Sequence, residues 1–155
     1  MLCGGSCVDT QNDRKNCGVC AKDCGIGDCS KGVCGPRVLA SGTGFRALAV
    51  DDSGVYFGLG NILGKCPLSG CNDPPDQLAA ALVANDIALT VSALYFADGY
   101  TLSYVPKTGG VATKVVQGAG ISALTSDGTI VSWARFGDVR GQVFTPGSTK
   151  LLSVQ

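Results

Sequence analysis

The sequence contains no histidine and no glutamate, and all of its acidic residues are aspartate. Histidine is the commonest general base and a leading metal ligand, so its absence excludes Ser-His-Asp and Cys-His catalysis and histidine-bound zinc. The absence of glutamate excludes glutamate general acids. No convincing catalytic set emerges from the aspartate, lysine, cysteine and tyrosine that remain. We therefore predict a non-enzymatic protein without a cofactor or a metal site.

Residues that favour long helices are also scarce. The chain has one methionine and 23 glycines among its 155 residues, and glycine weakens helix interiors. Its valine, threonine, tyrosine and phenylalanine suit strands instead. The predicted fold class is all-β, with a small disulfide-rich module at the N-terminus and a larger β domain after it.

Charge and hydropathy exclude two further classes. The formal net charge is zero, and the arginines and lysines form no run. The electrostatic footprint of a nucleic-acid-binding protein is therefore missing. No apolar run approaches the length of a membrane span. We expect no nucleic acid among the partners and no membrane span in this chain.

Most of the cysteines are concentrated near the N-terminus, where seven of the nine lie between Cys3 and Cys34. The residues between them are mostly small or polar, so disulfides are expected to hold a module over residues 1–35. Such a module indicates an oxidising, extracellular or cell-surface location. The pairing stays open among Cys3, Cys7, Cys17, Cys20, Cys24, Cys29 and Cys34.

Two metal sites are alternatives for this module. A zinc site would use Cys17, Cys20, Cys24 and Cys29. Disulfides are favoured, because the second of these pairs has the wrong spacing for zinc and three other cysteines would stay unexplained. Asp9, Asp13 and Asn16 have spacings that would suit calcium. They are interpreted as turn residues, because no Asp-x-Asp-x-Asp-Gly loop is present.

The module resembles a known family. It reads Cys3-Gly4 … Cys7-Val8-Asp9-Thr10 … Asp13 … Asn16-Cys17-Gly18-x-Cys20 … Cys24 … Cys29 … Gly32-x-Cys34. This pattern is similar to the stigma-specific Stig1-type cysteine-rich module, and similar modules occur in bacterial secreted proteins. The resemblance extends from the N-terminus to Cys34 and implies a secreted, cross-linked scaffold. Members often have a doubled Cys-Cys near the end, where this chain has Cys29 alone.

A pattern near residue 50 occurs three times. Residues 47–57, 86–96 and 121–133 each combine an alternating apolar strand, a short polar turn and a second strand that ends on an aromatic residue. The step from Tyr56 to Tyr95 equals the step from Pro67 to Pro106, and Pro146 follows after a step that is one position longer. A period near 40 with four short strands is typical of β-propeller blades.

We expect a domain over residues 36–155, with repeats near 37–82, 83–117 and 118–155. The first strand of each repeat, expected to be innermost, is predicted at Arg46–Val50, Ile87–Val91 and Ile121–Leu124. The second is predicted at Val55–Gly58, Ala93–Phe96 and Thr129–Trp133. The third is predicted at Ile62–Cys66, Thr101–Val105 and Gly141–Thr145, and the fourth at Gln77–Leu82, Thr113–Val116 and Lys150–Val154. Leu48 and Val50 are expected on one face and the small Ala47 and Ala49 on the other, where blades meet.

The repeats also resemble a known fold. Leu48-Ala49-Val50-Asp51-x-x-x-Val55-Tyr56-Phe57, followed by Cys66-Pro67-Leu68-Ser69-Gly70-Cys71-Asn72, is similar to six- or seven-bladed propellers of bacterial secreted and cell-surface proteins. Three repeats do not close a ring, because propellers have four to eight blades. Together with the odd cysteine and an N-terminus unlike a signal peptide, this predicts a fragment of a longer protein. Two chains that share one six-bladed ring, or an open array, are the alternatives.

Few residues are candidates for a site. Cys66 and Cys71 are predicted to form a local disulfide between a third and a fourth strand. Asp51, Asp52, Asp98 and Asp127 are interpreted as turn formers, with cation or sugar binding at a propeller rim as the alternative. Lys65, Lys107 and Lys150 are expected on a solvated face. The candidate ligand-binding residues are Asp98, Tyr100 and Trp133, because both aromatic side chains are expected to be exposed.

The predicted function is therefore that of an extracellular or cell-surface binding protein. Its propeller rim loops would contact a protein or a carbohydrate ligand without covalent chemistry. The first alternative is a structural protein that joins chains through open blade edges. The second is a propeller lyase or glycosidase that uses paired aspartates and a tyrosine. The oligomeric state distinguishes the binding protein from the assembly protein.

Overall fold

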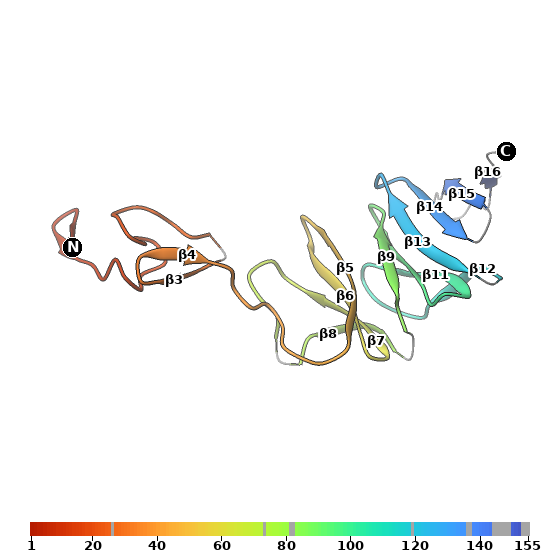
Figure 1. Cartoon of the computed structure of the whole chain (residues 1–155), viewed down its shortest axis with the longest axis horizontal. Coiled ribbons are helices and arrows are strands. Elements are labelled where there is room, and N and C mark those ends of the chain that lie inside the picture. Colours follow the sequence, from red (N-terminus) through yellow and green to blue (C-terminus); the bar gives the residue numbers. More distant parts are fainter. Residues whose placement is uncertain are drawn as a thin grey trace. The chain divides into compact units, whose positions relative to one another are not determined.

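The computed structural model describes residues 1–25, 27–72, 74–80, 83–118, 120–135, 138–143 and 150–152. Within these residues the chain is all-β and contains no helix, which confirms the predicted fold class at that level. The chain divides into two compact units (Figure 1). The first is Met1–Ala40 with Leu68–Gly70, and the second is Ser41–Pro67 with Cys71–Gln155.

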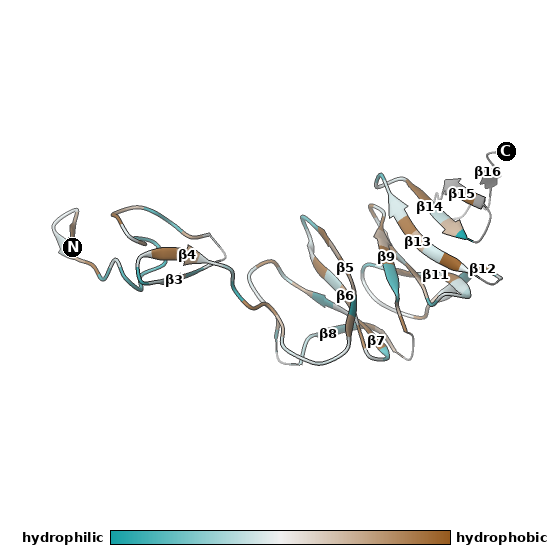
Figure 2. Ribbon diagram, viewed as in Figure 1, coloured by the Kyte–Doolittle hydropathy of each residue, from teal (hydrophilic) through white to brown (hydrophobic). Residues whose placement is uncertain are grey.

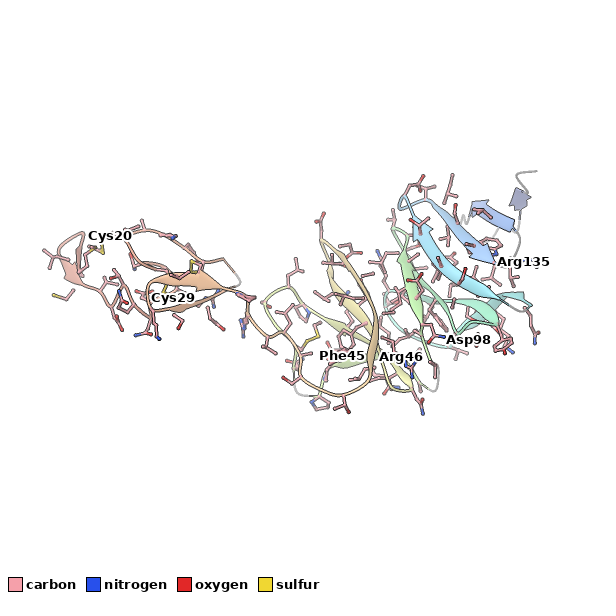
Figure 3. All side chains as sticks on the ribbon, viewed as in Figure 1. Cys20, Cys29, Phe45, Arg46, Asp98 and Arg135 are labelled. Carbon is pink, nitrogen blue, oxygen red and sulfur yellow. A yellow bond between two sulfur atoms is a disulfide. The ribbon has the colours of Figure 1, made fainter. Side chains whose placement is uncertain are left out.

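Disulfides cross-link the first unit. Its strands form two antiparallel pairs: β1 (Leu2–Cys3) with β2 (Ser6–Cys7), and β3 (Asp28–Ser30) with β4 (Val33–Gly35). The cysteines pair as Cys3–Cys20, Cys17–Cys29 and Cys24–Cys34, and Cys7 is an exposed free cysteine (Figure 3). Among the described residues of this unit, the buried hydrophobic side chains are those of Cys17 and Cys29. Cross-links and turns therefore hold it together.

Two successive turns of the first unit use the same side-chain hydrogen bonds. The Asp9 carboxylate accepts from the backbone N–H of Gln11 at 3.0 Å and from the side-chain amide of Asn12 at 2.8 Å. Asp13 accepts equivalent bonds from the residues two and three positions later, at 2.9 and 3.0 Å. The asparagine and backbone hydrogen bonds lower the pKa of both aspartates. The interpretation of Asp9, Asp13 and Asn16 as turn residues is confirmed.

The second unit contains three antiparallel sheets of four strands, and the strands of each sheet lie in sequence order. Sheet 1 consists of β5 (Phe45–Asp51), β6 (Gly54–Leu59), β7 (Ile62–Cys66) and β8 (Asp76–Ala80). Sheet 2 consists of β9 (Asp86–Leu89), β10 (Ala93–Ala97), β11 (Thr101–Pro106) and β12 (Thr113–Gln117). Sheet 3 consists of β13 (Ile121–Ser126), β14 (Ile130–Arg135), β15 (Asp138–Val143) and β16 (Lys150–Leu152).

Most predicted strands begin and end within two positions of the observed ones. The largest difference is in sheet 3, where the strand predicted at Gly141–Thr145 is observed at Asp138–Val143. The predicted start of this strand is wrong, because the prediction used Gly141 as the first residue of the strand. Gly141 lies inside β15. Pro146 and the predicted strand ends at 81–82, 144–145 and 153–154 lie outside the described residues.

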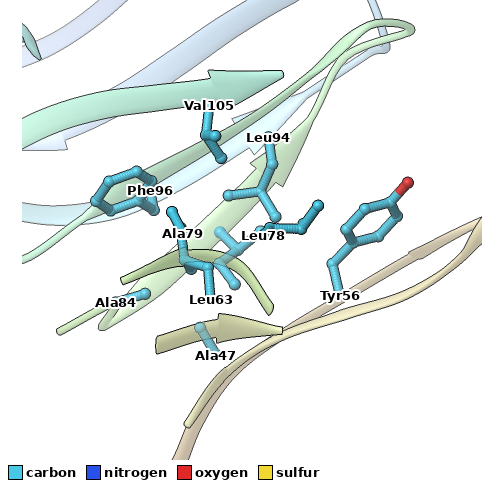
Figure 4. Packing of buried hydrophobic residues seen from close by; sticks show 10 residues of the cluster. Ala47, Tyr56, Leu63, Leu78, Ala79, Ala84, Leu94, Phe96 and Val105 are labelled. Atoms are coloured by element: carbon cyan, nitrogen blue, oxygen red, sulfur yellow. The ribbon is translucent and has the colours of Figure 1, made fainter. Parts of the chain in front are cut away.

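Sheet 2 packs between sheets 1 and 3. Leu94 and Phe96 of β10 join an apolar cluster with residues of sheet 1 (Figure 4). The alternate residues of the same strand, Ala93, Tyr95 and Ala97, join a second cluster with residues of sheet 3. This division follows from the two-residue period of a strand, which points successive side chains to opposite faces.

The first strands of the three sheets are neighbours. β9 contacts both β5 and β13, and an isolated parallel bridge joins Thr90 to Gly128. In strand β5 the apolar residues 47–50 lie between Arg46 and Asp51 (Figure 2). Ala47 is buried in the first cluster, whereas Leu48 and Val50 are 72% and 65% exposed. The predicted orientation is confirmed, and small side chains on one face let the sheets approach closely.

Candidate functional site

An open groove of about 610 Å³ lies where the first strands of the three sheets end. Its walls come from the last residues of these strands and from the turns that follow them. The lining comprises residues 49–53, 87–91 and 124–126, together with Lys107 and Gly128. The groove spans all three sheets because their first strands are neighbours and end beside it.

An ion pair joins two sheets at the groove. Asp51 ends β5, and its Oδ1 accepts from the backbone N–H and the hydroxyl of Ser53 at 2.8 and 2.7 Å. Its Oδ2 accepts a hydrogen bond of 2.5 Å from the ammonium group of Lys107. Lys107 is the residue that follows β11 of sheet 2. Burial alone would raise the pKa of Asp51. The bonds from Lys107 and Ser53 outweigh burial, so this pKa lies below its ordinary value.

The side chain of Tyr56 contacts groups on both sides of this ion pair. Its side chain is fully buried, and its hydroxyl lies 2.6 Å from the Ser53 hydroxyl. The ammonium groups of Lys65 and Lys107 lie 5.1 and 5.8 Å from the centre of its ring, within range of cation–π attraction. The expectation that Lys65 and Lys107 belong to a solvated face is wrong for Lys107, whose side chain is 14% exposed. The side chain of Lys150 lies outside the described residues.

The rest of the lining mixes apolar and polar groups. Val50 and Val91 are 65% and 84% exposed. The Asp52 side chain is exposed at the same turn as Asp51, and Ser126 accepts a hydrogen bond from the N–H of Gly128. The groove therefore offers aliphatic contacts, a carboxylate and hydroxyl groups to a ligand.

Asp98 and Tyr100, which the sequence singled out, lie away from this groove. Both lie in the turn between β10 and β11, whereas the groove residues of sheet 2 precede β10 or follow β11. The two groups therefore occupy opposite ends of these antiparallel strands. Asp98 accepts from the backbone N–H groups of Tyr100 and Thr101 at 2.7 Å each. Its backbone oxygen accepts from the side-chain amide of Asn85 at 3.0 Å, which connects this turn to the start of β9. Tyr100 is 69% exposed, as expected.

The predicted exposure of Trp133 is wrong. It was expected to be exposed, but it is 2% exposed and packs in the second apolar cluster. Its partner in register is Leu124 of β13, on the face of sheet 3 that meets sheet 2. Its Nε1–H is buried and has no hydrogen-bond partner among the described residues. Trp133 is therefore a packing residue between sheets 2 and 3.

Tyr95 and Asp127 also have structural roles. Tyr95 is 4% exposed, and its ring centre lies 5.5 Å from that of Tyr104. Burial, with a smaller contribution from Tyr104, raises the pKa of Tyr95 to about 12. Asp127 accepts from the backbone N–H groups of Thr129 and Ile130, which confirms it as a turn residue.

The sulfur atoms offer no thiolate set for a metal among the described residues. Those of Cys17, Cys24 and Cys34 lie within 4.8 Å of one another, but each of these cysteines is in a disulfide. The zinc alternative for the module needs free thiols, and the disulfides consume them. In the second unit, Cys66 and Cys71 form a disulfide.

No protein-family model matches this chain. No curated protein matches it either. The resemblances to a Stig1-type module and to bacterial propellers therefore stay predictions.

Two groups that sequence reasoning missed connect neighbouring sheets. One is Lys107, which reaches Asp51 across the boundary between sheets 1 and 2. The other is Asp86 at the start of β9, whose Oδ2 accepts from the N–H of Leu124 in sheet 3 at 2.6 Å. The period of the repeats hinted at equivalent turns, but only the packing of sheet on sheet places these groups together.

Proposed function

We propose that this chain is a non-enzymatic extracellular binding protein whose three sheets are β-propeller blades. The strand order supports the propeller, because each blade of such a fold is a four-stranded antiparallel sheet with its first strand nearest the axis. The contacts of β9 with both β5 and β13, and the position of all three strand ends at one groove, agree with that arrangement.

The groove at the ends of the first strands carries the proposal. Its volume of about 610 Å³ falls in the range of ligand-binding clefts. The exposed Val50 and Val91 beside Asp52 favour a peptide segment of a protein, which offers both apolar side chains and backbone amides. An exposed aromatic side chain for sugar stacking is absent from the lining that the described residues form.

The same lining gives little support to a lyase or a glycosidase. A general acid at neutral pH needs a raised pKa. The pKa of Asp51 is lowered instead, because Lys107 and Ser53 stabilise its ionised form. The groove is therefore suited to binding by shape and charge.

The disulfides support an extracellular location. Four of them occur among the described residues, and disulfides persist in oxidising compartments. No helix in the described part of the chain is long and apolar enough to cross a membrane.

Selection of peptides from a phage-displayed library on the immobilised, disulfide-intact chain tests the proposal. Enriched peptides are then measured by fluorescence polarisation against Asp52→Lys and Val91→Lys, which alter exposed groove positions. Tyr100→Ser, at the opposite end of the strands of sheet 2, is the matched control. We expect both groove variants to weaken binding at least about tenfold and the control to leave it unchanged.

Three results would count against the groove. These are the absence of any enriched peptide, binding that is insensitive to both groove variants, and binding that Tyr100→Ser alone removes. A glycan array probed with the same variants covers the carbohydrate alternative. Glycan binding that is lost in Tyr100→Ser and kept in Val91→Lys would move the site to the turn that carries Asp98 and Tyr100.

A further inference from the structure

The lining of the groove carries three charged side chains, and two of them neutralise each other. The Lys107 ammonium donates to Oδ2 of Asp51, and its side chain is largely buried. The other carboxylate oxygen of Asp51 accepts from the backbone N–H and the hydroxyl of Ser53. The pair therefore adds no net charge to the groove, and both carboxylate oxygens of Asp51 are already hydrogen-bonded.

Asp52 supplies the remaining charge. It is exposed and is the first residue of the turn between β5 and β6. Its carboxylate forms no hydrogen bond or ion pair with the part of the chain that the structure describes. Lys65 lies near the same turn, but its ammonium is 5.1 Å from the centre of the Tyr56 ring and reaches no described carboxylate. The groove thus presents one uncompensated negative charge.

Exposed aliphatic side chains lie in the same lining. Val50 precedes Asp52 by two positions, which is about 6–7 Å of extended chain. Val91 belongs to sheet 2, and its backbone N–H donates to the carbonyl of Gly128 in sheet 3 at 3.0 Å. The parallel bridge between Thr90 and Gly128 adds to this connection. The backbone that carries Val91 is therefore fixed by two neighbouring sheets before any ligand binds.

A long cationic side chain fits this combination of groups. Lysine and arginine pack their alkyl stems along apolar surface while the charged end reaches a polar partner. The exposed valines suit such a stem, and Asp52 suits the charged end. An acidic side chain would meet the unpaired carboxylate of Asp52, whereas the ammonium of Lys107 already has a carboxylate partner. The charge of the groove therefore favours a basic ligand over an acidic one.

We propose that the groove selects peptide segments that contain lysine or arginine, with the alkyl stem against Val50 and Val91 and the charged end paired with Asp52. This inference rests on the proposed function, because it specifies which peptides the groove binds. The charge pair lies in an open groove, so it determines the choice of ligand more than the total affinity.

An array of blocked pentapeptides, with every residue type at each of the three central positions, tests the inference. The labelled, disulfide-intact chain is compared with Asp52→Asn, which removes the charge and keeps the size of the side chain. Asp76→Asn is the matched control, because Asp76 is exposed on β8 of the same sheet and lies outside the groove. We expect the bound peptides to contain lysine or arginine and to bind Asp52→Asn about three- to tenfold more weakly. Asp76→Asn should bind them like the wild type.

Charge reversal gives a second readout on the same array. For Asp52→Lys we expect aspartate and glutamate to replace lysine and arginine in the bound peptides, because the repulsive and attractive charges exchange places. Salt should weaken the binding of basic peptides to the wild type between about 50 and 500 mM, since it screens an exposed charge pair. Circular dichroism checks that each variant is folded.

Val91→Ser separates failure of this inference from failure of the proposed function, because it removes an aliphatic contact without changing the charge. Peptides that bind Val91→Ser more weakly but show no basic preference would keep the groove as the binding site and overturn the inference. A preference of the wild type for acidic peptides would overturn it too, as would a basic preference that Asp52→Asn leaves unchanged. An array without bound peptides, or binding that both variants leave unchanged, would contradict the inference and the proposed function together.

Discussion

Asp51 and Lys107 show how single residues connect neighbouring sheets. One belongs to the turn after β5 and the other follows β11, so they are 56 residues apart in the sequence. The pair is partly buried, with side-chain exposures of 27% for Asp51 and 14% for Lys107. Removing one partner of such a pair leaves the other charge incompletely compensated, which costs more than losing an exposed ion pair.

We expect Lys107→Met to lower the free energy of unfolding by roughly 1–2 kcal/mol, because Asp51 would lose its charged donor in a partly buried position. Urea denaturation at pH 7 measures the change. Lys114→Met is the control, since Lys114 is exposed on β12. Equal effects of the two substitutions would show that the ion pair contributes nothing specific.

The pH dependence of this difference has a definite sign. The pKa of Asp51 in the folded protein lies below its ordinary value near 3.8. Stability from the ionised carboxylate is therefore present above that ordinary value and lost as the pH falls through the lowered pKa. The gap between wild type and Lys107→Met should shrink below about pH 4. A gap that stays constant down to pH 3 would contradict the ionic origin of the effect.

At the scale of the elements, the turns between strands determine how closely the strands pair. Gly54 begins β6 with a φ of +148°, a conformation that L side chains rarely adopt. A Cβ at this position would lie 2.4 Å from the backbone oxygen of Cys66 in β7. The turn that carries Asp51 and Ser53 therefore requires glycine for both its backbone angle and its space.

We expect Gly54→Ala to lower the free energy of unfolding by roughly 2 kcal/mol, because it introduces both backbone strain and a steric clash. Thermal and urea denaturation measure the loss. Gly42→Ala is the control in the same unit, since a Cβ there would make ordinary contacts at 3.5 Å and no left-handed φ is required. It should leave stability unchanged or slightly raised. If both alanines are tolerated equally, Gly54 is not needed for the turn.

At the scale of the whole molecule, the two units depend on different forces. The first has three disulfides and little buried apolar surface. The second has two apolar clusters between its sheets and, in its described part, a single disulfide that spans five positions. On the loop-entropy account, so short a bridge contributes little to stability.

Reduction of the disulfides should therefore affect the stability of the two units differently. With a phosphine reductant at pH 7, we expect backbone amides of residues 1–35 to lose protection from hydrogen exchange, because the cross-links alone maintain that structure. Amides of β10 and β11 should stay protected, because apolar packing on both faces holds them in sheet 2. Mass spectrometry of exchanged peptides measures both. Loss of protection in sheet 2 at the same reductant concentration would mean that the disulfides stabilise the whole chain.

Local physical chemistry explains which features could be predicted. Alternation of apolar residues and the turn residues between them placed most strands within two positions, because both signals act over a few residues. The turn roles of Asp9, Asp13 and Asp127 were predictable for the same reason, since each aspartate bonds to groups two or three positions later. The groove was not predicted, because it forms from residues of three different sheets.

The sequence by itself determined the all-β class, the strands and their threefold repetition, because these depend on spacing along the chain. Only the tertiary structure decided which cysteines pair, since seven cysteines in one short module allow many arrangements. It also buried Trp133 and brought Lys107 to Asp51, because both outcomes depend on how one sheet packs on the next. The contacts between sheets are non-local, and a local pattern cannot specify which residue meets which across such a boundary.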